Sequence, residues 1–168
     1  GLVELEVIPQ GNNGLKFYNH SENVTYYLEG YQVDTFDYDM LFYDNIEYFL
    51  QEYVGWEKSY SEVVGGPYAF DYENYLSFTP ENITTFYSSE DPIGTNIDNV
   101  FWDFVGSYEV FDLEGEDYIK GLELNYEGGD FEDFDVTVLD DGTIELYNID
   151  TYAIYEFSGR NFIQYLKD

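Results

Sequence analysis

The last third of the chain alternates apolar and polar residues, and this pattern constrains the fold more than any other feature of the sequence. Apolar side chains occupy every second position in 121–126, 133–138 and 144–146. Such alternation is typical of a β-strand with one face on the core and one face in water. The pattern predicts one antiparallel meander with a strand every ~10 residues, as in sheets that close into barrels. Its turns are expected near 128–129, 140–142 and 158–159.

Upstream of the meander, one segment favours a helix and several favour strands. In 44–54, Asp44 can cap the helix N-terminus, Glu47 completes a capping box and Gly55 suits the C-terminal cap. The segments 59–73 and 88–99 are rich in turn-forming residues and predict loops. Further strands are expected at 2–8, 15–18, 24–29, 31–38, 75–78 and 83–87. The predicted fold class is therefore mainly β, an antiparallel meander or barrel with one short α-helix, in a single domain over 1–168.

The balance of charge is extreme. Thirty-six acidic residues face five basic ones, which gives a formal net charge of −31. Twenty tyrosines and fourteen phenylalanines still supply enough apolar surface for a core, so the composition is not that of a disordered chain. A field of this sign disfavours nucleic acid and anionic lipid as partners. It is compatible with a cationic partner, with high salt or with a need for solubility, and the sequence leaves these three open.

Two absences narrow the chemistry further. The chain has no cysteine, which excludes a disulfide framework, a zinc finger and a thiol nucleophile. No apolar run approaches the ~20 residues of a membrane-spanning helix, so no transmembrane segment is expected.

The sequence predicts no catalytic residue, no cofactor and no metal site. His20 is the only histidine, and no nucleophile elbow accompanies it, so a surface role is favoured over a catalytic triad. Paired carboxylates could serve glycoside hydrolysis, but thirty-six acids offer no basis for choosing a pair. Asp130, Asp133 and Asp135 could hold calcium, although their spacing is not that of an EF-hand loop. The simpler interpretation is a solvated acidic face.

The segment 109–135 is the densest acidic stretch, with eleven acids and one basic residue, Lys120. This segment is the best candidate for a surface that binds a basic partner. The candidate partner-binding residues within it are Asp112, Glu114, Glu116 and Asp117. The alternative is a solvated sheet edge, on which charge prevents edge-to-edge aggregation.

Aromatic residues offer a second candidate site. An exposed tryptophan can stack on the apolar face of a sugar ring while neighbouring carboxylates accept hydrogen bonds from sugar hydroxyls. Trp56 is the candidate for this role, and its alternative is a core position beneath the predicted helix. Trp102 lies in the apolar run 100–105, which favours the core.

Short motifs resemble a group of known proteins. The stretch Gly14-Leu15-Lys16-Phe17-Tyr18, with Gly30, Val33 and Phe36-Asp37-Tyr38 after it, resembles a segment of uncharacterised lipoproteins of Bacteroidetes bacteria, and the turn Gly129-Asp130-Phe131-Glu132 is similar in character. The resemblance implies an extracytoplasmic location and a calycin- or lipocalin-like β-barrel. It carries over no catalytic residue. The lipid-attachment cysteine of such proteins is missing here, so any lipid anchor would lie upstream of Gly1.

Two functions follow as expectations. The first is a non-enzymatic, extracytoplasmic binding domain for a small molecule or a glycan. The alternative is an acidic inhibitor that mimics nucleic acid and binds a basic protein, which the scarcity of lysine favours. An enzyme ranks third, and the ordinary surface of a salt-adapted protein ranks fourth.

Overall fold

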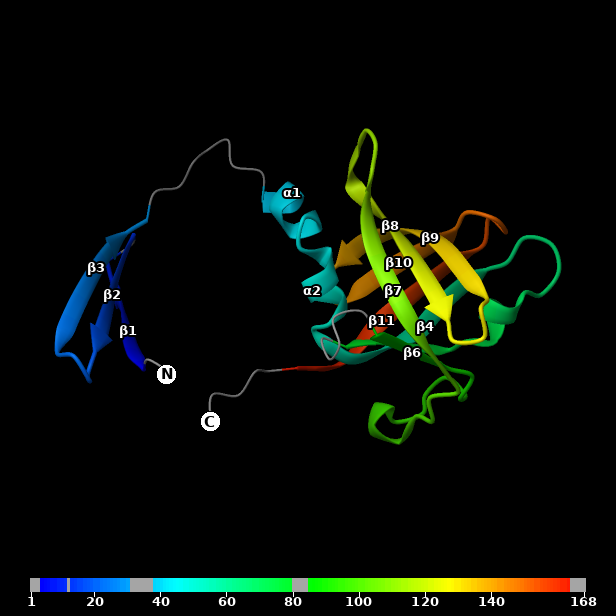
Figure 1. Ribbon diagram of the computed structural model, residues 1–168, viewed down its shortest axis with the longest axis horizontal. Coiled ribbons are helices and arrows are strands. Elements are labelled where there is room, and N and C mark those ends of the chain that lie inside the picture. Colours follow the sequence, from blue (N-terminus) through cyan, green and yellow to red (C-terminus); the bar gives the residue numbers. More distant parts are fainter. Residues whose placement is uncertain (1–3, 12, 31–37, 80–84, 164–168) are drawn as a thin grey trace. The chain divides into compact units, whose positions relative to one another are not determined.

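The computed structural model describes residues 4–11, 13–30, 38–79 and 85–163 (Figure 1). The chain divides into two compact units, Gly1–Asp37 and Tyr38–Asp168. The expectation of a single domain over 1–168 stays a prediction, and each unit is described by itself. Among the described residues, no helix is both long and apolar enough to cross a membrane.

The first unit is a three-stranded antiparallel sheet. Its strands β1 (Leu5–Gln10), β2 (Gly14–Asn19) and β3 (Val24–Glu29) pair in sequence order. This agrees with the strands expected at 15–18 and 24–29, whereas the first strand begins and ends later than expected. The segment expected to be extended at 31–38 lies outside the described residues, apart from its last position.

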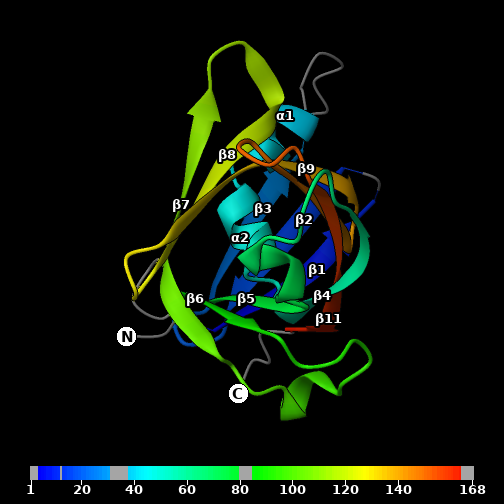
Figure 2. The same cartoon turned by 90° about the vertical axis from the view of Figure 1, so that its right-hand side faces the viewer.

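The second unit is a closed barrel of eight antiparallel strands (Figure 2). Each strand pairs with the next one along the chain, and the last pairs with the first. This confirms the antiparallel meander closing into a barrel, and the arrangement is compatible with a lipocalin-like fold. The strands are β4 (Tyr53–Glu62), β5 (Tyr75–Thr79), β6 (Thr85–Ser89), β7 (Phe104–Leu113), β8 (Glu116–Tyr126), β9 (Phe131–Asp140), β10 (Thr143–Asn148) and β11 (Ile154–Phe162).

Alternate residues of the strands point into the barrel and fill it. Leu122 and Leu124 on β8, and Phe134 and Val136 on β9, are completely buried. The predicted alternation in 121–126 and 133–138 is therefore confirmed, and it assigns one side of each strand to a core rich in aromatic rings. The largest fully buried side chains of that core are Trp56, Tyr108, Tyr155, Phe70, Phe78, Phe86, Phe134 and Phe157. Tyr75 is buried in a separate cluster with Ile97 and Val100.

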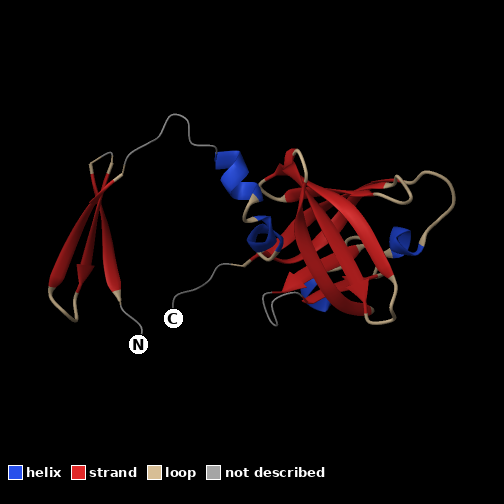
Figure 3. Ribbon diagram, turned by 45° about the horizontal axis from the view of Figure 1, so that its top comes forward, coloured by secondary structure: helices blue, strands red, loops and turns tan. Residues whose placement is uncertain are grey.

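Helices contribute little to this unit, as Figure 3 shows by colour. The helix expected over 44–54 is shorter than predicted. Two short helices are present instead, α1 (Tyr38–Tyr43) and α2 (Ile46–Leu50), and β4 begins at Tyr53. The buried face of α2 is the expected one, with Ile46, Phe49 and Leu50 in the barrel core.

The C-terminal cap expected at Gly55 is wrong, because Gly55 lies inside β4. A side chain there would collide with Ile97, and the carbonyl of Leu76 lies close by. The glycine therefore serves close packing rather than a turn. Helix α2 ends at Leu50, and the indole Nε1 of Trp56 on β4 donates to the Leu50 carbonyl at 2.8 Å.

Two of the three turns predicted for the meander are confirmed. Residues 128–129 connect β8 to β9, and residues 141–142 connect β9 to β10. The third, at 158–159, is wrong, because β11 runs through it without interruption. The ring of Tyr53 covers Gly159, so this glycine makes room for a neighbouring side chain across the sheet. The loop expected over 59–73 begins only after Glu62, the last residue of β4.

Candidate functional site

The two ends of the barrel are closed differently. Because the strands are antiparallel, the start of β4 and the end of β8 lie at opposite ends. Helix α2 covers the end at which β4 starts, where Gln51 Nε2 donates to the Tyr108 hydroxyl at 2.6 Å. At the other end, a short 3-10 helix η1 (Ala69–Tyr72) inserts Phe70, which is buried against Phe134 at a ring-centroid distance of 4.7 Å.

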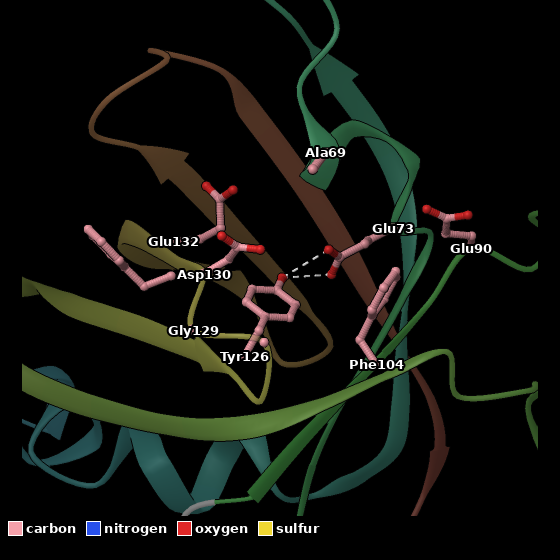
Figure 4. A pocket seen from close by; sticks show the side chains of 10 residues that line it. Ala69, Glu73, Glu90, Phe104, Tyr126, Gly129, Asp130 and Glu132 are labelled. Atoms are coloured by element: carbon pink, nitrogen blue, oxygen red, sulfur yellow. Dashed lines mark hydrogen bonds between the residues drawn. The ribbon is translucent and has the colours of Figure 1, made fainter.

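A pocket of about 600 Å³ opens beside η1 at this second end (Figure 4). It is lined by the loop between β4 and β5, by the residues around the β6–β7 loop and by the turn between β8 and β9. Its volume lies within the range that is ordinary for small-molecule sites, roughly 300–1,000 Å³. The side chains that shape it include Ala69, Glu73, Phe104, Tyr126, Asp130 and Glu132.

A buried carboxyl–phenol pair forms one wall of the pocket. The Tyr126 hydroxyl lies 2.9 Å and 2.8 Å from the two carboxyl oxygens of Glu73, and Glu73 is only 4% exposed. Burial raises the pKa of Glu73 to about 7, although the bond from Tyr126 and the charge of Lys58 act in the opposite direction. Burial and the adjacent Glu73 also raise the pKa of Tyr126, so its hydroxyl remains a proton donor.

The Ser88 hydroxyl lies next to this pair. It is fully buried on β6 and makes no hydrogen bond of sound geometry. It is nevertheless near enough to the carboxyl of Glu73 to lower its pKa. A polar atom therefore remains unsatisfied beside the pocket wall, which is uncommon in a folded interior.

Further carboxylates complete the rim of the pocket. Burial raises the pKa of Glu132 on β9, with the charges of Asp150 and Asp133 adding to the effect, while the amide of Asn148 donates to its carboxylate at 2.7 Å. Asp130 and Glu90 are exposed and also line the pocket. Among the described residues that line it, four are acidic and none is basic.

Aromatic rings supply the apolar part of the lining. The Phe104 ring meets the Tyr126 ring edge-on at a centroid distance of 6.2 Å. Phe131, which follows the β8–β9 turn, is 59% exposed and is a lining residue as well. The pocket therefore combines exposed aromatic surface with carboxylates.

Two lysines of the barrel are buried, Lys58 and Lys120, and Lys58 binds groups within the barrel. Lys58 on β4 lies among three aromatic rings, with Nζ 5.1 Å from the centroid of Tyr155 and 5.7 Å and 5.8 Å from those of Phe70 and Phe157. Its ammonium donates to the carbonyl of Asp71 at 3.0 Å. Burial lowers its pKa to about 8. Lys58 thus holds the η1 segment against the barrel and forms no ion pair with Glu73 within 4 Å.

The candidate acidic residues lie elsewhere. Asp112, Glu114, Glu116 and Asp117 are exposed at the tip of the β7–β8 hairpin, which projects beyond the neighbouring strands in Figures 1 and 2. The carboxylate of Asp112 accepts from Lys120 Nζ at 2.7 Å. This tip is at the barrel end opposite the pocket, so the structure does not bring these residues together with Glu73.

The other residues considered from the sequence are Trp56, the run 100–105 and His20. Trp56 is completely buried in the barrel core, which matches its alternative interpretation rather than a role in stacking on a ligand. In the run 100–105, Val100 is buried but Phe101 is exposed, so only part of it is core. His20 is exposed in the first unit and lies 3.1 Å from the carboxylate of Glu6. Among the described residues, no three acidic or histidine side chains converge to form a metal site.

The sequence did not predict the pocket. Asp130 and Glu132 were considered only as part of the acidic stretch 109–135, with Asp130 also a possible calcium ligand. Glu132 is in phase with Phe134 and Val136, and Tyr126 is in phase with Leu122 and Leu124. Both therefore had to point into the barrel. Glu73 follows an irregular loop, and nothing in its sequence context marks it as buried.

Comparison with known proteins adds no family assignment. No protein-family model matches the chain, and neither the curated proteins nor the solved structures give a significant match.

Proposed function

We propose that the barrel is a non-enzymatic binding domain that takes a small organic ligand in the pocket beside η1. The observation that carries the proposal is a pocket of about 600 Å³ that is already open and combines aromatic and acidic side chains at one end of a closed barrel. Barrel mouths are common ligand sites, because the strands form a rigid frame while the loops provide the specific contacts.

The composition of the lining supports binding rather than catalysis. The Glu73–Tyr126 pair is buried against one wall, and the described lining offers neither a nucleophile next to a base nor a basic side chain. A glycan or another small molecule with hydroxyl or amino groups could be held by these carboxylates and by the exposed rings of Phe104 and Phe131. An extracytoplasmic location, which the resemblance to bacterial lipoproteins supports, is part of the same proposal and is tested by cell fractionation.

The test is a ligand-detected NMR screen with a library of sugars, neutral fragments and amines. The variant Ala69→Trp should fill the pocket from its rim, because Ala69 lines the pocket but is exposed and lies outside the barrel core. A matched control, Glu114→Trp, introduces the same side chain at the hairpin tip. We expect at least one class of compound to bind the wild type and the control but not Ala69→Trp. Binding by none of the library, or equal binding by all three proteins, would contradict the proposal.

A second candidate function is the capture of a basic protein by the β7–β8 hairpin. The supporting observation is that the exposed residues Asp112, Glu114, Glu116 and Asp117 lie at the tip of this hairpin, and the hairpin extends beyond the neighbouring strands (Figure 2). Such an interaction should weaken steeply with added salt. A pull-down at low and high salt with the wild type distinguishes it from ligand binding in the pocket, which responds to Ala69→Trp.

A further inference from the structure

We infer that the pocket beside η1 selects a small organic cation, a protonated amine carried on an aromatic or aliphatic body. This inference rests on the proposed function and specifies the chemical class of its ligand. It is carried by the placement of four carboxyl groups and three aromatic side chains around one cavity, and by the few partners of the buried one, Glu73.

The negative charge of the pocket lining favours a positively charged ligand. Glu73, Glu90, Asp130 and Glu132 all border the cavity, and no basic residue of the described lining offsets them. An anionic ligand would meet repulsion from every side. Figure 4 shows that Asp130 and Glu132 lie together on one side of the Tyr126 hydroxyl, while Glu73 lies on the other. A cation between these groups would therefore be attracted from two sides.

The hydrogen bonding of Glu73 points to a missing donor. A carboxylate has about four acceptor positions. Glu73 receives one hydroxyl proton, shared between its two oxygens, although it is 4% exposed and has little access to water. The Ser88 hydroxyl beside it is also without a partner of sound geometry. An ammonium group brings up to three N–H donors and a positive charge, which are the contacts that a buried carboxylate lacks.

The titratable groups that shift the pKa of Glu73 come from three strands, and they leave its negative charge largely uncompensated. Tyr126 on β8 donates a neutral hydrogen bond, and Glu132 on β9 adds negative charge. Lys58 on β4 contributes a favourable charge, but its ammonium is bound to the η1 carbonyls among three rings. Glu73 remains protonated for part of the time near neutral pH for this reason, and a bound cation would favour its ionised form.

The aromatic part of the lining favours an apolar body that carries the ammonium group. Phe104, Phe131 and Tyr126 present ring surface to the same cavity. Rings attract cations through their faces, and such contacts strengthen when water is excluded. A bare metal ion would not use this surface, and no three carboxylates of the described residues converge to coordinate one. The combination fits an organic body with one ammonium group.

The test compares three ligands that share one ring: phenethylamine, phenethyl alcohol and phenylacetate. Their binding is measured by calorimetry and NMR at pH 8, with calcium chloride as a fourth ligand. We expect phenethylamine to bind at least tenfold more tightly than the alcohol, and phenylacetate and calcium not to bind. At pH 7, where Glu73 is only partly ionised, binding should release protons, which appears as a dependence of the heat on the buffer. The affinity should fall at least tenfold between pH 8 and pH 5.5, as Glu73 becomes protonated.

Variants separate this inference from the proposed function. Glu73→Gln should weaken the binding of phenethylamine at least tenfold at pH 8 and abolish the proton release at pH 7. Glu132→Gln should weaken the binding by a smaller factor. The exposed control Glu114→Gln should bind as the wild type does. If the alcohol or a sugar binds as well as the amine, and Ala69→Trp blocks it, the proposed function stands and the choice of a cation is wrong. Binding of calcium in place of the amine, or an unchanged affinity of Glu73→Gln for phenethylamine, would also overturn the inference of an organic cation. No binding by any compound would contradict both.

Discussion

Replacing Glu73 by glutamine should stabilise the folded barrel at neutral and alkaline pH. The glutamine side chain is neutral at every pH, and its amide oxygen could still accept the hydrogen bond from Tyr126. In the wild type, the carboxyl group is buried and ionises only at a cost to the folded state. The substitution therefore removes a charge that the unfolded chain tolerates well and the folded chain does not.

The magnitude follows from the two pKa values. Burial raises the pKa of Glu73 from 4.5 to about 7. Each pH unit of difference corresponds to about 1.4 kcal/mol, so the ionised carboxyl group costs the folded state roughly 3 kcal/mol. Below pH 4.5 both states are protonated and this cost is absent. As the pH rises from 4.5 to 7, the unfolded chain ionises first and the wild type loses stability. Above pH 7 the loss is complete.

Denaturant unfolding of both proteins between pH 4 and pH 8 measures the effect. Intrinsic fluorescence can follow the transition, because Trp56 is buried in the barrel core. The difference in free energy of unfolding between Glu73→Gln and the wild type should be small at pH 4 and should grow to roughly 3 kcal/mol at pH 8. Taking the difference cancels the general effect of the net charge. The exposed control Glu114→Gln should show no comparable growth. A flat difference across this range would refute the account of Glu73 as a carboxyl group held neutral by burial.

Two further substitutions test the packing of α2 and the role of the hairpin tip. Phe49→Ala should lower the free energy of unfolding by about 3–5 kcal/mol, because the ring is buried and contacts the indole of Trp56, whereas Tyr48→Ala on the exposed side of the same helix should have little effect. The triple change of Glu114, Glu116 and Asp117 to lysine should leave the melting temperature unchanged or slightly higher, because it relieves repulsion among exposed acids. Asp112 is excluded from that variant because it pairs with Lys120. A clear loss of stability in the triple variant would show that the tip is structural.

The sequence specified the barrel well where a local pattern determines the structure. Alternation in 121–126 and 133–138 predicted strands, faces and turns correctly, because a strand with one buried face has little freedom of register. The predictions of a helix cap at Gly55 and a turn at Gly159 were wrong. Both glycines lie within strands, at positions where a side chain distant in sequence occupies the space that a Cβ would need. The local sequence pattern cannot predict a contact of that kind.

In the candidate site, too, some residues could be placed from the local sequence pattern and others depend on distant contacts. Tyr126 and Glu132 could have been placed inside the barrel from the phase of their neighbours. Glu73 could not, because its burial depends on the η1 segment folding back over the barrel and on Tyr126, which is 53 residues away. The prediction of a partner-binding surface at 109–135 rested on the density of its acidic residues alone. Its four candidate residues lie at the exposed tip of a hairpin, whereas Asp130 and Glu132, from the end of the same stretch, line the pocket with Glu73 and Glu90 from other parts of the chain.

The closure of the barrel has a consequence for how the chain reaches this structure. Seven of the eight strand pairs join consecutive strands, but β4 and β11 pair Tyr53 with Phe162, at opposite ends of the barrel sequence. The entropy cost of joining two segments grows with the length of chain between them, so we expect this pair to form last during folding. Until then both strands present free edges that could pair with another molecule. A net charge of −31 keeps such half-closed chains apart, so the acidity of the protein protects it during assembly as well as in its folded state.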